Sequence, residues 1–117
     1  MRPSPHSFLA DRAMRQLQAR LQDWVRRVEA ARDLDAAIRA ACDVPRPAGP
    51  YAAAIRGPAS PHIAAGKARV EAVLNRRLDA IDGGPAVLDP AHRRRLFERL
   101  RGRFPGPAAR LDPCRPA

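Results

Sequence analysis

Threonine is absent from the 117-residue chain, lysine occurs once, and only five residues are aromatic. The alternation of β-branched and polar residues that marks a half-buried strand is also absent, so an all-α fold is expected. No apolar run approaches the ~20 residues of a membrane span. The chain does not open on the apolar stretch of a secretory signal. These absences predict a helical, cytoplasmic protein without a membrane-spanning segment.

Motifs that carry chemistry are missing as well. The two cysteines, Cys42 and Cys114, form no CxxC pair, and no histidine has a metal-binding partner three or four residues away on a helix. Glycine-rich phosphate loops, paired carboxylates and nucleophile elbows are not found. We therefore expect no catalytic residue, no metal site and no cofactor, and we predict that the protein is not an enzyme. Cys42 is expected to be a small buried residue and Cys114 an exposed thiol.

What the chain has in abundance is arginine and alanine. It holds 21 arginines and 24 alanines, and only 26 residues are Val, Ile, Leu, Met, Phe or Trp, so a thin core is expected. The net charge of +10 and the pI of about 11.5 favour a polyanionic partner: nucleic acid, an acidic protein or an anionic membrane surface. GC-rich coding sequences, as in some bacteria, also enrich arginine, alanine and proline. Codon usage is therefore an alternative explanation for part of the charge.

Residues 1–44 are predicted to form one long amphipathic helix. Its apolar residues are alternately four and three apart, the heptad pattern of a coiled coil: Ala10, Met14, Leu17, Leu21, Trp24, Val28 and Ala31. The apolar face then shifts to Leu34, Ile38 and Ala41, so the helix either bends near residues 32–35 or restarts with Asp33 as its N-cap. Three acid–base pairs at a spacing of four are expected to support the exposed face: Asp11–Arg15, Asp23–Arg27 and Asp35–Arg39.

The rest of the chain is expected to form three parts: a Pro-, Ala- and Gly-rich linker at 45–60, a basic two-helix hairpin at 61–104, and a mobile Pro-rich tail at 105–117. The second helix of the chain should start with Ser60 as its N-cap and Pro61 as its first residue, and it should stop at Gly83. The third helix should start after Asp89.

Positive charge is densest in the third predicted helix. Residues 90–110 contain seven arginines and a single acid, Glu98. The candidate nucleic-acid-binding residues are the cations of this region and of the helix before it: Arg93, Arg94, Arg95, Arg99, Arg101, Arg103, Arg76, Arg77 and Lys67. We predict that they contact the phosphate backbone of DNA or RNA with low sequence specificity, because no aromatic residue is interleaved with the arginines on the polar face of the helix. The alternative is that the Arg-Arg-Arg run is simply a solvated helix face.

Three of these cations, Lys67, Arg77 and Arg93, fall close to the apolar stripes of their helices. An unpaired cation is costly to bury. We therefore expect each of them to reach solvent at the rim of the core, to pair with a carboxylate, or to meet an anion or a partner.

The heptad seam supports a second hypothesis, a helical protein–protein adaptor. Its interface would consist of Met14, Leu17, Leu21, Trp24 and Val28, through which the first helix would form a homodimer or bind an acidic protein. Trp24 would then be an interface hot spot, whereas in a folded single chain it would anchor the core. Whether the first helix packs on the rest of its own chain decides between these possibilities.

Overall fold

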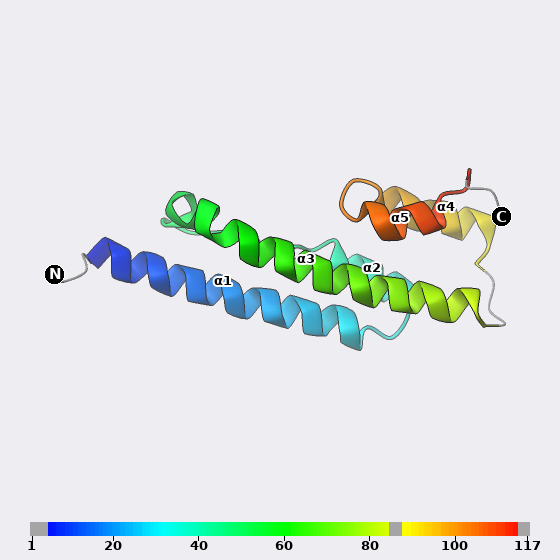
Figure 1. Cartoon of the computed structure of the whole chain (residues 1–117), viewed down its shortest axis with the longest axis horizontal. Helices are drawn as coiled ribbons and strands as arrows, with labels where there is room; N and C mark the ends of the chain where they lie inside the picture. The colour runs from blue at the N-terminus through cyan, green and yellow to red at the C-terminus, as the bar shows by residue number, and fades with distance from the viewer. Residues whose placement is uncertain (1–4, 85–87, 115–117) are drawn as a thin grey trace.

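The computed structural model describes residues 5–84 and 88–114, and within them all regular structure is helical, which confirms the all-α prediction. The helices are α1 (Pro5–Ala30), α2 (Leu34–Ala41), α3 (Ala52–Asp82), α4 (Pro90–Leu100) and α5 (Pro105–Leu111). Figure 1 shows α1 and α3 side by side along the long axis, with α5 packed on α3 and α4 packed on α5. The protein measures 62 × 25 × 19 Å, so it is an elongated bundle rather than a sphere.

The long N-terminal helix is interrupted where the heptad pattern shifts. The Asp33 carboxylate accepts a hydrogen bond from the backbone N–H of Ala36 at 2.8 Å, so Asp33 is the N-cap of α2. Leu34 and Ile38 are buried, as the shifted pattern predicts. The restart folds α2 back beside α1 instead of extending it.

The heptad seam of α1 forms the centre of the core. Leu17, Leu21, Trp24 and Val28 are buried, and Met14 is half-buried against them. The covering surfaces come from α3 and α2 of the same chain. Within the described residues, every buried side chain is apolar. The first helix therefore packs intramolecularly, and Trp24 is a core anchor.

Gly66 lets α1 and α3 approach closely. It is buried, and a Cβ atom added to it would lie 3.4 Å from Cζ3 of Trp24 and 3.6 Å from Cδ2 of Leu21. These are ordinary van der Waals distances, so there is room for one methyl group and for little more. The glycine is thus explained by helix packing rather than by a turn.

Gly66→Ala and Gly66→Leu should consequently have opposite effects on stability. Alanine should raise the free energy of unfolding by about 0.5–1 kcal/mol, since it favours the helix and its methyl group fits. Leucine should lower it by about 1–3 kcal/mol, because its further atoms must displace the Trp24 ring. Urea denaturation monitored by circular dichroism measures both. Wild-type stability in the leucine variant would mean that α1 and α3 do not approach this closely.

The predicted start of the second long helix is wrong, because α3 begins at Ala52 and not after Ser60. Its buried face already includes Ile55 and Ala59. Pro58 and Pro61 cannot donate to the carbonyls four residues before them. These carbonyls belong to Ala54 and Gly57, and all four residues are exposed, so water can replace the missing bonds. Burial of the apolar face thus overrides the proline signal, and the irregular linker ends at Tyr51 instead of residue 60.

The C-terminal region is more ordered than predicted. Asp89 caps α4 as expected, accepting a hydrogen bond from the N–H of His92 at 3.3 Å. Residues 105–111, expected to belong to the mobile tail, form α5, whose Pro107, Ala108 and Leu111 are buried. The chain reverses direction between α3 and α4, as a hairpin requires (Figure 1). It is α5, however, that packs on α3, while α4 contacts α2 and α5.

Candidate nucleic-acid interface

The inner face of α4 fixes this helix on the bundle. Leu96 and Leu100 are buried in the shared core. His92, expected to be a surface residue, is instead half-buried, and its Nε2 lies 2.6 Å from Oδ1 of Asp35 on α2. This contact takes the Asp35 carboxylate away from the predicted pair with Arg39. The inner face of α4 thus orients the helix so that its other residues face solvent.

The outer face of α4 carries free positive charge. Arg94, Arg95 and Arg99 are exposed, and none has an ion-pair or hydrogen-bond partner for its side chain among the described residues. The one acid of the helix, Glu98, lies 3.4 Å from Arg101. Three guanidinium groups on a helix of 11 residues are therefore not neutralised. Such a surface attracts phosphates.

Two residues that were predicted to contact nucleic acid, Arg77 and Arg93, form hydrogen bonds within the protein. Arg77 is half-buried and donates to the backbone carbonyls of Glu29 and Ala31 at the C-terminal end of α1. These carbonyls have no helical partner, and a cation also complements the helix dipole there. Arg93 is half-buried and donates to the carbonyl of Arg110 near the end of α5. Backbone carbonyls therefore satisfy the hydrogen-bond donors of both cations. From the sequence, these side chains were expected to reach solvent, a carboxylate, an anion or a partner, and carbonyls of the same chain were not among the expected acceptors.

Sequence reasoning missed Arg110, which joins α5 to α3. Its Nη2 lies 2.7 Å from Oδ1 of Asp79 and 2.9 Å from Oδ2 of Asp82, and its Nη1 donates to the carbonyl of Asn75 at 3.0 Å. Partial burial lowers the pKa of Arg110, but the hydrogen bonds and charges of Asp82 and Asp79 outweigh it and raise the pKa overall. The group is therefore always charged. No sequence signal could have found this cluster, because Arg110 lies 28 to 35 residues after its partners on α3.

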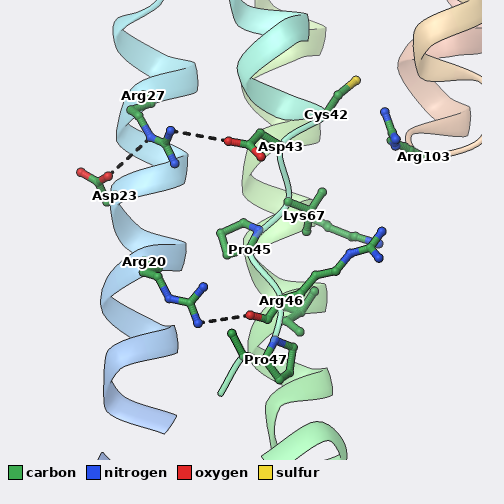
Figure 2. Close-up of a pocket in the computed structure, with 13 residues that line it drawn as sticks. Arg20, Asp23, Arg27, Cys42, Asp43, Pro45, Arg46, Pro47, Lys67 and Arg103 are labelled. Atoms are coloured by element: carbon green, nitrogen blue, oxygen red, sulfur yellow. Dashed lines mark hydrogen bonds and ion pairs between the residues drawn. The ribbon is translucent and has the colours of Figure 1, made fainter. Parts of the chain in front are cut away.

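A second basic surface lies where the linker crosses between α1, α3 and the turn after α4. A groove of about 790 Å³ there is lined by five cations: Arg20, Arg27, Arg46, Lys67 and Arg103. Figure 2 shows Arg46 and Lys67 extending from the linker and α3 toward the turn that carries Arg103. Of these five, only Lys67 and Arg103 were candidates from the sequence. The others come from α1 and the linker, and only the fold brings them together.

The two acids that line this groove already form ion pairs. Arg27 lies 3.4 Å from Asp23 and 3.8 Å from Asp43, and Arg20 donates to the backbone carbonyl of Arg46 at 3.1 Å (Figure 2). The Asp23–Arg27 pair was predicted. The pairs Asp11–Arg15 of α1 and Asp35–Arg39 of α2 do not form within the residues the structure describes, so these arginines are less often partnered than expected.

The remaining candidates divide between surface and core. Arg76 is exposed near Arg77 and has no partner in residues 5–84 or 88–114. The interface candidates Leu17, Leu21, Trp24 and Val28 are buried under α3 and α2, so an adaptor or a homodimer cannot use this seam unless the chain opens. Cys42 is half-buried rather than buried, and Cys114 is exposed.

Comparisons with known protein families, with curated proteins and with solved structures find no match to this chain. None of the helices in the described part of the chain combines the length and apolarity needed to cross a bilayer.

Proposed function

We propose that the protein binds the phosphate backbone of nucleic acid through the outer face of α4, with low sequence specificity, as an accessory protein of the cytoplasm. The observation that carries the proposal is that Arg94, Arg95 and Arg99 are exposed together without acidic partners in the described residues. Guanidinium groups contact phosphates through paired N–H donors, and clustered positive charge speeds association with a polyanion.

Further support comes from what surrounds this face. Arg101 and Arg103 are exposed just beyond α4 and extend the basic surface. Phe97 is half-buried, so α4 exposes no large aromatic ring for base stacking. Backbone contacts without a stacking platform favour binding that depends on salt and little on sequence. The adaptor alternative has no comparable support, since its seam lies in the core.

The test measures fluorescence anisotropy of labelled DNA and RNA duplexes between about 50 and 200 mM salt. The wild type should bind with a steep salt dependence. Replacing Arg94, Arg95 and Arg99 by alanine should weaken binding by about tenfold or more and lower the slope of log K against log salt by about 2–3.

A matched control removes three other exposed arginines, Arg12, Arg26 and Arg56, which lie on α1 and at the start of α3. This variant has the same net charge as the α4 variant and should bind almost as well as the wild type. Absence of binding at low salt would rule out the proposal. Equal losses in the two variants would also oppose it, because they would reflect net charge rather than a site on α4.

A further inference from the structure

Three of the five cations that line the groove described above are exposed and unpaired in the part of the chain that the structure describes. Arg27 lies beside both acids of the groove, Asp23 and Asp43, and the five cations and two acids of its lining leave a net charge of +3. Arg46, Lys67 and Arg103 are exposed, and their side chains have no hydrogen-bond or ion-pair partner within the described residues. Like charges held in one concave surface repel one another and focus a positive potential into it. Holding these cations together therefore costs electrostatic free energy, which a bound anion would offset.

The cations come from three separate parts of the chain. Arg46 belongs to the linker, Lys67 to α3, and Arg103 to the turn between α4 and α5. The linker is itself held in place, because Arg20 of α1 donates to the carbonyl of Arg46. In Figure 2 the tips of Arg46 and Lys67 lie on the side of the linker that faces Arg103. An anion in this position would bridge segments that the sequence keeps far apart.

The walls of the groove are partly apolar. Between the cations lie Val44, Pro45, Pro47 and Ile63, each of them half-buried. The volume of about 790 Å³ is within the range of small-molecule sites. A ligand that suits this surface carries several negative charges close together, as a chain of phosphates does. Arginine binds phosphate oxygens with paired donors, and lysine binds them as a point charge.

We propose that this groove is a binding site for an oligophosphate chain, inorganic or attached to a nucleoside, contacted by Arg46, Lys67 and Arg103. This site goes beyond the proposed function, because its ligand is a small molecule and because Arg94, Arg95 and Arg99 take no part in it. Bound oligophosphate would link the linker and α3 to the turn after α4 and stabilise the folded chain.

The experiment titrates the full chain with inorganic tripolyphosphate by isothermal calorimetry at about 50 mM salt, without added divalent metal. We expect a dissociation constant on the order of 10 µM. Arg46→Ala, Lys67→Ala and Arg103→Ala should each weaken binding by about tenfold. The triple variant should show no binding, while its circular dichroism spectrum stays that of the wild type, because all three side chains are exposed.

The matched control is the variant with Arg94, Arg95 and Arg99 replaced by alanine, which loses the same charge and should bind tripolyphosphate within about twofold of the wild type. ATP should bind about as tightly as tripolyphosphate if the phosphate chain is the recognised part, and AMP at least about tenfold more weakly. Tighter binding of ATP than of tripolyphosphate would identify a nucleoside as the carrier of the chain.

The proposal is overturned if tripolyphosphate does not bind, if the control variant loses binding equally, or if an oligoglutamate peptide binds as tightly. It stands apart from the proposed function. If tripolyphosphate binds and duplexes do not, the groove site is supported and the nucleic-acid surface on α4 is rejected. If duplexes bind and tripolyphosphate does not, the α4 surface is supported and the groove site is rejected.

Discussion

Trp24→Ala is expected to lower the free energy of unfolding by about 4 kcal/mol and the melting temperature by roughly 15 °C. The indole is fully buried, contacts the position of Gly66, and donates from Nε1 to the carbonyl of Ala40 at 2.8 Å. Alanine would remove the largest buried side chain where α1, α2 and α3 meet. It would also remove the indole donor from the Ala40 carbonyl, which would keep the backbone N–H of Asp43. Thermal and urea denaturation followed by circular dichroism measure the loss.

Trp24→Phe separates the two contributions. Phenylalanine keeps most of the apolar volume but cannot donate to Ala40, so a smaller loss of about 2 kcal/mol is expected. Arg12→Ala on the exposed face of α1 serves as the control and should change stability by less than about 0.5 kcal/mol. If Trp24→Ala cost less than about 1 kcal/mol, the seam of α1 would not form the core of the single chain.

Arg110→Ala should lower the free energy of unfolding by about 2–3 kcal/mol and expose α5 to proteolysis. The side chain contacts Asp79, Asp82 and Asn75, all of them on α3. The two carboxylates are largely exposed, so solvent screening keeps the effect below that of a buried ion pair. Because the pKa of Arg110 is raised, the contribution should persist through mildly alkaline pH and respond to salt instead.

A double-mutant cycle tests whether the ion pairs carry this effect. Replacing Asp79 and Asp82 together by asparagine should destabilise the protein less than Arg110→Ala does, since the bond to the Asn75 carbonyl remains. Combining the three changes should give less than the sum of the separate losses. Strict additivity, or an α5 as resistant to protease as in the wild type, would show that apolar contacts alone hold this helix.

Periodicity and capping predicted much of the fold. The heptad seam, the stripe of α3 and the Asp89 cap depend on neighbours within a few residues, so the sequence predicts them. The Asp33 cap is one of two alternatives that the sequence leaves open. The start of α3 could not be read in this way. Pro58 and Pro61 are strong local signals against a helix, and only the burial of Ile55 and Ala59 against the rest of the bundle overrides them.

The candidate site was less predictable, because whether an arginine is exposed or bonded within the protein depends on hydrogen-bond acceptors that are distant in the sequence. Arg93 and Arg94 are adjacent in sequence, yet one donates to a carbonyl of α5 while the other is exposed. The acceptors are backbone carbonyls, which every residue has, so composition cannot point to them. The groove is a similar case, because Arg46 and Lys67 meet only when the linker folds back along α3.

The hydrogen bonds of Arg110 show what arginine provides at one position that lysine could not. Arg110 uses both terminal nitrogens, Nη1 for the Asn75 carbonyl and Nη2 for the carboxylates. A lysine would carry the same charge on one nitrogen and could not hold both groups in a fixed geometry. Arg110→Lys would leave the net charge at +10 and yet loosen the attachment of α5 to α3. Arginine at this position is therefore a requirement of the architecture, whatever the coding sequence contributes elsewhere.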